Sequence, residues 1–326
     1  MQQRKIALIG GGQIGGTLAL LAMQRCLGHV VLLDMAGGVA AGKALDLSQM
    51  AALSSSDVQL VGGDQPNSIA DADVCIVTAG FPRKPGMDRE DLLQKNLDVM
   101  RQVADHIVRY APQAFVICLT NPLDAMVYAL HKMTRLPKQQ IVGMAGVLDS
   151  ARFRTFLAQQ LGVSRRDVTA LVLGGHGDDM VPLPRFCSVG GIALPQLVQM
   201  GLLQQQQLDD IIQRTRQGGG EIVQLLGNGS AFYAPAQSAL DMAEAFLMGT
   251  GRVLPCAALL EGEYGVSGLF VGVPAVLGGQ GVQQVLQLPL QQEELAAFEN
   301  SVQSVRRSVQ QVDRLLTKQV DTVASA

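Results

Sequence analysis

The sequence predicts an α/β protein, with a doubly wound parallel sheet followed by a second, α+β domain. Over residues 1–145, short β-branched apolar runs alternate with longer amphipathic runs, a rhythm typical of β-α-β units. The short runs are continuously apolar, as expected of parallel strands buried on both faces. After residue 145 this rhythm is lost. We therefore expect one domain over residues 1–145 and a second over residues 146–326.

The first domain is expected to hold a series of short strands separated by helices. The predicted strands are KIALI, HVVLLD, DVQLVGG, DVCIVTAG, AFVICLT and QIVGM, at residues 5–9, 29–34, 57–63, 73–80, 114–120 and 140–144. Apolar residues at helical spacing predict the intervening helices. These helices cover residues 14–26, 40–53 and 90–111.

The second half mixes helices and strands without a regular order. A helix is predicted over residues 148–162 and a strand over residues 167–175, with further short strands after it. The remaining segments are helices at 204–226 and 234–248, strands at 251–262 and 268–278, and a closing helix at 293–316. This pattern favours an α+β domain.

Composition excludes several classes of function. The net charge of −3 gives no electrostatic basis for binding nucleic acid or an anionic membrane. No apolar run approaches the roughly 20 residues that span a bilayer. The five cysteines are scattered and form no C-x-x-C pair, which favours reduced core thiols and a cytoplasmic location. Ligand spacing for a metal is absent, so we expect none.

A glycine motif follows the first predicted strand and opens the first predicted helix. Gly10, Gly12 and Gly15 match G-x-G-x-x-G. Glycine permits the tight turn, lets the backbone approach a pyrophosphate, and lets the helix pack on the strand. The helix N-terminus then offers free N–H groups to the phosphates. This context predicts a Rossmann dinucleotide site rather than a simple glycine-rich turn.

Asp34 closes the second predicted strand at about the expected distance from the glycines. Its carboxylate can accept hydrogen bonds from both adenosine ribose hydroxyls and would repel a 2′-phosphate. Met35 supplies no compensating cation. The sequence therefore favours NAD over NADP. Thr78, Ala79 and Gly80 end the fourth strand, where small residues can line the same crevice.

His176 is the histidine with the most accessible ring expected, because it lies between glycines in GGHGD after an apolar run. It is therefore a candidate for a functional role. His106 and His131 fall within helix patterns and His29 starts a strand. Asp149 and Arg152 are three residues apart near a helix start, so they share a face. From the residues alone, this pair could equally be an acid offsetting the helix dipole and a solvated arginine.

Two arginines, Arg83 and Arg89, lie in GFPRKPGMDREDLLQKN at residues 80–96. Pro82, Pro85 and Gly86 predict neither helix nor strand at its start. The segment therefore has the composition of a loop.

Six segments together carry a resemblance that spans nearly the whole chain. They are IGGGQIGG, TAGFPRKPGMDREDLLQKN, TNPLDAM, GMAGVLDSARFR, LGGHGDDMVPL and GSAFYAPAQS. In this order they resemble the malate and lactate dehydrogenase family, and most of all its lactate-dehydrogenase-like malate dehydrogenases of bacteria. The resemblance implies an NAD-binding Rossmann domain before residue 145, a substrate and catalytic domain after it, and a homodimer or homotetramer.

The resemblance also implies roles for individual residues. His176 would be the proton donor and acceptor, with Asp149 as its orienting partner. Arg152 would bind the C1 carboxylate of the substrate and Arg89 would polarise its reacting carbonyl. Asn121 would hydrogen-bond near the substrate oxygen and the nicotinamide ribose, and Arg83 would read the far end of the substrate. The residues that we expect to contact NAD are Gly10, Gly12, Gln13, Ile14, Gly15, Asp34, Thr78, Ala79, Gly80, Asn96 and Asn121.

Arginine at position 83 favours a dicarboxylate, malate or oxaloacetate, because lactate-specific relatives commonly carry glutamine there. The segment from Gly80 to Asn96 shows no insertion, which favours the same type. Phe232 stands where the family often has tyrosine, and Gln13 is a second departure. Three alternatives stay open: L-lactate dehydrogenase, an NAD-dependent glycosidase, which would need a metal, and a non-catalytic NAD-binding sensor.

Overall fold

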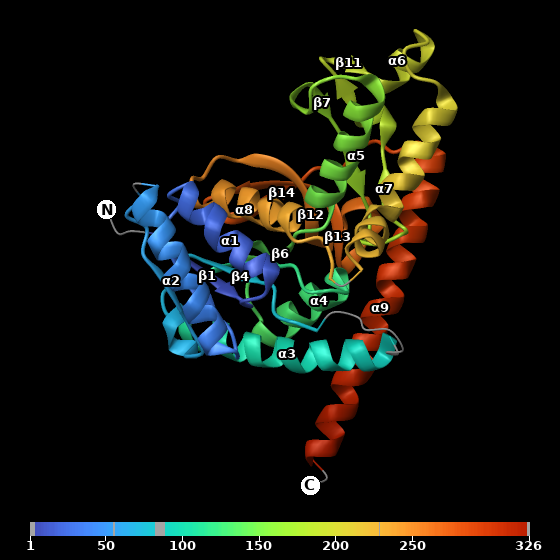
Figure 1. The fold of residues 1–326 in the computed structure, drawn as a ribbon. Coiled ribbons are helices and arrows are strands. Elements are labelled where there is room, and N and C mark those ends of the chain that lie inside the picture. The colour runs from blue at the N-terminus through green and yellow to red at the C-terminus, as the bar shows by residue number, and fades with distance from the viewer. Residues whose placement is uncertain (1–3, 55, 82–88, 228, 325–326) are drawn as a thin grey trace.

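The structure is a computed structural model that describes residues 4–54, 56–81, 89–227 and 229–324. Figure 1 shows two lobes joined along one sheet. The last helix runs beside the second lobe, and its C-terminal end projects past the rest of the molecule. The predicted α/β architecture is confirmed, because a large, mainly parallel sheet is covered by helices and followed by a mixed lobe.

Six parallel strands build the first lobe. They are β1 Lys5–Ile9, β2 His29–Leu33, β3 Leu60–Gly63, β4 Val74–Val77, β5 Phe115–Cys118 and β6 Ile141–Gly143. Their helices are α1 Gln13–Gln24, α2 Gly37–Leu53, α3 Arg89–Tyr110 and α4 Leu123–Thr134. The spatial order of the strands is β6-β5-β4-β1-β2-β3. From β1 the chain first adds strands toward one edge, β2 and β3, and then toward the other, β4 to β6, so the switch point lies between β1 and β4. Ligands bind at such a switch point, outside the carboxyl ends of the strands.

Residues of the second half complete the first sheet. The strands β12 Arg252–Glu261, β13 Ser267–Gly278 and β14 Gly281–Val285 add antiparallel to the β6 edge, where Ala257 pairs with Gly143. An open edge at β6 would leave backbone groups unpaired, and β12 pairs with them instead. The sheet is therefore continuous across residue 145, where the domain boundary was expected.

The other elements of the second half are short strands and long helices. The helices are α5 Gly146–Leu161, α6 Leu194–Gln199, α7 Gln205–Leu226, α8 Tyr233–Leu247 and α9 Gln292–Ala324. The short strands are β7 Val168–Thr169, β8 Val172–Leu173, β9 Val181–Pro182, β10 Ser188–Val189 and β11 Ile192–Ala193. The single strand predicted over 167–175 is wrong, since β7 and β8 belong to different small sheets. Leu171 between them stays partly buried, so the apolar run continues through the break.

The main core surrounds the large sheet. Cys75 in β4 and Cys118 in β5 are buried, as predicted, whereas Cys26 after α1 is exposed and is no core thiol. α8 belongs to this core through residues such as Leu240 and Met242. A parallel sheet must be covered on both faces, and a helix from the second half supplies part of that cover. The two halves are therefore packed as one body around the sheet.

Candidate active site

The glycine loop between β1 and α1 is shaped by close backbone contacts. A Cβ atom at Gly15 would lie 1.9 Å from the carbonyl oxygen of Gly10, and one at Gly10 would lie 2.5 Å from Thr78 Oγ1. Gly10 also has φ of +118°, which disfavours a side chain. Nothing lies within 4 Å of a Cβ at Gly12. The loop is thus packed tightly against the sheet and open at Gly12, as a pyrophosphate cradle at the α1 N-terminus requires.

Asp34 follows β2 and faces this loop. Its Oδ2 accepts a hydrogen bond from Gly11 N at 2.5 Å and its Oδ1 accepts one from Ala36 N at 2.8 Å. A Cβ at Gly37 would lie 2.9 Å from the Asp64 side chain, so a second carboxylate stands at the end of β3. Two carboxylates therefore stand at the carboxyl ends of β2 and β3.

Lys43 on α2 is a residue of this site that sequence reasoning missed. Its Nζ donates to the carbonyl oxygens of Gly11 at 2.7 Å and Gly12 at 2.8 Å. The ammonium group therefore ties α2 to the glycine loop and places a positive charge beside the open position at Gly12. The sequence around Lys43 has the pattern of an ordinary amphipathic helix. Its contact with the glycine loop arises only in the folded chain.

The segments after β4 and β5 form the neighbouring wall. Thr78 Oγ1 donates to the carbonyl oxygen of Gly10 at 3.1 Å, and Thr120 Oγ1 donates to that of Ala79 at 2.7 Å. Asn121 is exposed at the end of β5 and joins Pro122 through a cis peptide bond. Gln13 and Ile14 are the first two residues of α1, directly after the glycine loop.

Asn96 on α3 is fully buried and its amide is engaged by the backbone. Its Oδ1 accepts from Phe81 N at 2.7 Å, and its Nδ2 donates to the carbonyl oxygen of Asn121 at 2.8 Å. It therefore connects the segment after β4 to the segment after β5. A cofactor contact of Asn96 itself stays a prediction, and its amide already bonds the backbone of Phe81 and Asn121.

His176 and Asp149 form a buried pair. His176 Nδ1 lies 2.8 Å from Asp149 Oδ2, and the two side chains are 12% and 2% exposed. A carboxylate can only accept here, so Nδ1 carries the proton and Nε2 is free of this bond. Burial alone would lower the pKa of His176, but the charge and hydrogen bond of Asp149, together with the charge of Asp124, outweigh burial and leave that pKa raised. The pair has the properties of a general acid and base.

Arg152 lies one helical turn from Asp149 on α5. Its Nη1 donates to Asp149 Oδ1 at 3.0 Å, and its Nε is buried without a hydrogen-bond partner. A Cβ at Gly219 on α7 would lie 3.5 Å from Arg152 Nη2. The guanidinium is therefore held between α5 and α7 with donors to spare for an anion. Asp149 and Arg152 are thus neither a dipole-offsetting acid nor a solvated cation.

Of the two arginines predicted on the loop, the structure describes the backbone of one. Arg83 lies outside the described residues. Arg89, which was expected on the loop, is the first residue of α3. Glu90 and Asp91 follow it in the first turn, where acidic residues favour a helix start. The helix that carries Arg89 also carries Asn96 two turns later.

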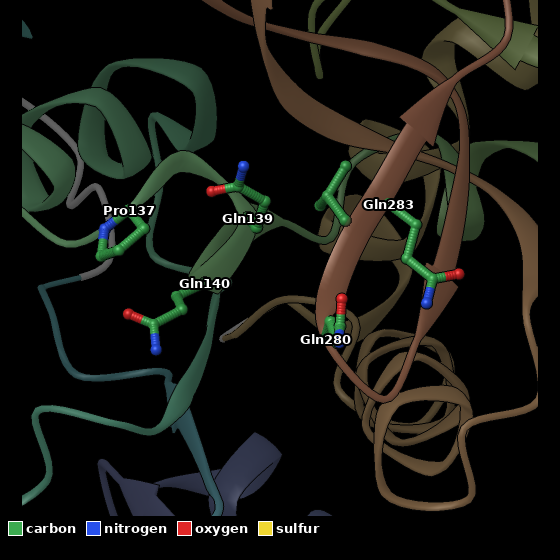
Figure 2. Close-up of a pocket in the computed structure, with 6 residues that line it drawn as sticks. Pro137, Gln139, Gln140, Gln280 and Gln283 are labelled. Atoms are coloured by element: carbon green, nitrogen blue, oxygen red, sulfur yellow. The ribbon is translucent and has the colours of Figure 1, made fainter.

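Of two cavities among the described residues, one is lined by none of the candidate site residues and the other is lined in part by Arg152. One of about 500 Å³ is lined by Pro137, Gln139, Gln140, Gln280, Val282 and Gln283, and Figure 2 shows these side chains on two facing segments with no ionisable group among them. Another, of about 290 Å³, adjoins Arg152 between α5 and α7. The described residues contain no cluster of three His, Cys, Asp or Glu side chains that could hold a metal. No helix among them is long and apolar enough to cross a membrane.

Two domain profiles of known proteins match nearly the whole chain. The lactate/malate dehydrogenase NAD-binding domain matches residues 4–143, and the α/β C-terminal domain of the same family matches residues 146–315. The chain belongs to the lactate/malate dehydrogenase family. It is therefore an oxidoreductase that acts on a 2-hydroxy acid with a nicotinamide cofactor. Membership in this family decides against the NAD-dependent glycosidase and against a non-catalytic sensor.

Individual relatives in this family are close. Malate dehydrogenase 1 of Anaeromyxobacter dehalogenans is 61% identical over 310 residues, which cover 94% of this chain and 98% of the relative. The crystal structure of Cryptosporidium parvum malate dehydrogenase is 47% identical with a TM-score of 0.94, over 96% of this chain and 100% of that one. The lactate dehydrogenase of the same organism, complexed with lactic acid and β-nicotinamide adenine dinucleotide, is 43% identical with a TM-score of 0.93, over 96% and 99%.

Proposed function

We propose that this chain is an NAD-dependent malate dehydrogenase, which interconverts (S)-malate and oxaloacetate. The observation that carries the proposal is the buried His176–Asp149 pair beside Arg152, close to the carboxyl edge that holds the glycine loop. Relatives at 61% and 58% identity bear the name malate dehydrogenase. Their names favour malate over lactate, the leading alternative.

The proton is handled by His176. When malate is oxidised, the hydride of C2 passes to the nicotinamide, which supplies the redox chemistry. The hydroxyl proton passes to His176 Nε2, because Nδ1 already carries a proton bonded to Asp149. Asp149 then faces an imidazolium and stabilises it. In the reverse direction, the imidazolium returns the proton to the oxygen of oxaloacetate.

Substrate orientation falls to the guanidinium groups. Arg152 retains free donors in a planar fork, which suits the C1 carboxylate with two parallel hydrogen bonds. Arg89 would polarise the C2 carbonyl, and its effect grows as negative charge develops on that oxygen. Asn121 would hydrogen-bond the same oxygen and the ribose.

Discrimination between malate and lactate is assigned to Arg83. Its guanidinium would pair with the second carboxylate, which malate has and lactate lacks. Pyruvate in the closed site would leave that cation desolvated and unpaired, at a cost of roughly 2–5 kcal/mol, or about 30- to 3000-fold. The same reasoning favours NAD over NADP at Asp34, where carboxylates would face a 2′-phosphate.

The experiment is a paired rate assay on oxaloacetate and pyruvate, with NADH and with NADPH. We expect kcat/KM to favour oxaloacetate and NADH. Arg83→Gln should shift the preference toward pyruvate, while Lys84→Gln, which removes a neighbouring cation, serves as the matched control. Comparable kcat/KM values for the two acids in the unaltered protein would refute the malate assignment.

Assembly and location are part of the same proposal. Exposed apolar side chains on α2, such as Val39 and Leu45, support a homodimer or homotetramer because burial in an interface removes them from water. The cysteines, which are free in the described residues, support a cytoplasmic location. Light scattering coupled to size-exclusion chromatography should give a mass of two or four chains, and a single-chain mass would contradict it.

A further inference from the structure

Asp124 is a buried carboxylate that the reaction described above does not use. It is the second residue of α4 and lies against the segment that carries His176. Its Oδ2 accepts a hydrogen bond from the backbone N–H of His176 at 2.8 Å. Its Oδ1 is buried and has no hydrogen-bond partner. A buried carboxylate with only one of its oxygens hydrogen-bonded destabilises the fold unless a nearby positive charge offsets the loss of hydration.

The neighbouring amide shows what a purely structural acceptor looks like. Gly175 N donates to Ser301 Oγ on α9 at 2.9 Å, so a neutral hydroxyl is sufficient to hold that position. At the next residue the acceptor is a carboxylate instead. A Cβ at Gly175 would lie 2.7 Å from Val305 and 3.2 Å from Asp124 Oδ2. The absence of a side chain at Gly175 therefore permits the close approach of Val305 on α9, and it leaves Asp124 Oδ2 room on the same side.

The charges that surround His176 balance only when Asp124 is counted. α5 contributes Asp149 and Arg152, and α4 contributes Asp124. α9 packs against the adjacent Gly175 through the neutral side chains of Ser301 and Val305. Imidazolium and guanidinium together then face two carboxylates. Without Asp124, these described groups would carry one excess positive charge when His176 is protonated.

We propose that Asp124 is a positioning residue that holds the His176 backbone and, as a second anion beside Asp149, stabilises the imidazolium form of His176. This inference rests on the proposed function, because imidazolium is the acid that oxaloacetate reduction needs. Burial raises the pKa of Asp124 to about 6, while the His176 N–H and charge oppose that rise. The negative charge of Asp124 is therefore present above about pH 6, where it supports imidazolium.

The test measures His176 directly, without substrate. Histidine labelled with ¹³C in the ring is followed by NMR from pH 5 to pH 10, and His176→Asn identifies the signal among the four histidines. Asp124→Asn keeps an oxygen acceptor for the His176 N–H and removes the charge. We expect the His176 titration midpoint to fall by about one pH unit, and the alkaline limit of oxaloacetate reduction to fall by the same amount.

Three further variants make the outcome decisive. Asp149→Asn should lower the midpoint more, because it removes both a charge and the ring hydrogen bond. Asp313→Asn removes an exposed carboxylate that pairs with Lys132 on α4, and it should leave the midpoint within about 0.2 unit. Asp124→Ser copies the neutral acceptor at Ser301 and should reproduce the Asp124→Asn shift if the asparagine variant folds poorly.

A His176 midpoint unchanged in both Asp124 variants would overturn the proposal and leave Asp124 as a backbone acceptor only. Preference for another 2-oxo acid would overturn the proposed substrate while leaving this titration result intact. The two failures are therefore distinguishable.

Discussion

The glycine loop and the His176 cluster are both sites of close contact, but they are assembled differently. The glycine loop bonds to the first half of the chain, from Asp34, which is 23 positions from Gly11, to Thr78, which is 68 positions from Gly10. The His176 cluster joins four separate segments, and the hydrogen bond from Gly175 to Ser301 spans 126 positions. The first site is built largely from backbone geometry, whereas the second depends on buried charges. Substitutions in the first should therefore change cofactor affinity, and those in the second should change turnover.

His176→Asn is expected to have the largest effect and to separate the two sites. Asparagine cannot exchange a proton near neutral pH, so kcat should fall about 10³- to 10⁴-fold in both directions. NADH affinity, measured by fluorescence titration, should stay within about twofold because the glycine loop is untouched. A kcat within tenfold of the unaltered protein would show that another group transfers the proton.

Asp34→Asn should alter cofactor choice without altering the proton chemistry. The neutral amide still accepts from the loop backbone but no longer repels a 2′-phosphate. The ratio of kcat/KM for NADH to that for NADPH should fall about 10- to 100-fold, equivalent to about 1.4–2.7 kcal/mol. Asp64→Asn, at the neighbouring strand end, should produce a smaller fall. An unchanged ratio in Asp34→Asn would place cofactor selection elsewhere.

The rates of oxaloacetate reduction and of malate oxidation should depend on pH in opposite ways, and both should change around the raised pKa of His176. Reduction of oxaloacetate requires imidazolium, so its kcat/KM should be constant below that pKa and fall about tenfold per pH unit above it. Oxidation of malate requires neutral imidazole and should rise over the same interval. Because the folded pKa is raised, the stability from the Asp149 pair should also be lost as pH rises through it. A flat reduction rate from pH 6 to pH 10 would contradict the role of His176.

Lys43→Met should have the smallest effect. It removes the ammonium that bonds the carbonyl groups of Gly11 and Gly12, and NADH affinity should weaken by about 1 kcal/mol, or about fivefold. Lys132→Met, which removes an exposed lysine from α4, is the matched control and should leave NADH affinity unchanged. Equal affinities in both variants would mean that Lys43 serves α2 packing alone.

Sequence reasoning recovered the segments that local chemistry defines. The strand before Gly10, the helix after it and Asp34 at the next strand end all lie where they were expected. Asp149 was recognised with His176 only through the family resemblance, because periodicity cannot show which helix faces a distant loop. Lys43, Asp124 and Ser301 were missed as parts of the two sites. Their side chains look ordinary in the sequence, and their importance comes from what they touch.

The sequence by itself determined the parallel strands, the glycine turn and the place of Asp34 at the end of the second strand, because these depend on side-chain size, periodicity and charge within short segments. Only the tertiary structure decided that β12 pairs with β6 and that α8 covers the first sheet. It alone also placed Asp124 against the amide of His176. Such contacts depend on how buried surfaces and charges from distant segments are satisfied together, and no local pattern contains that information.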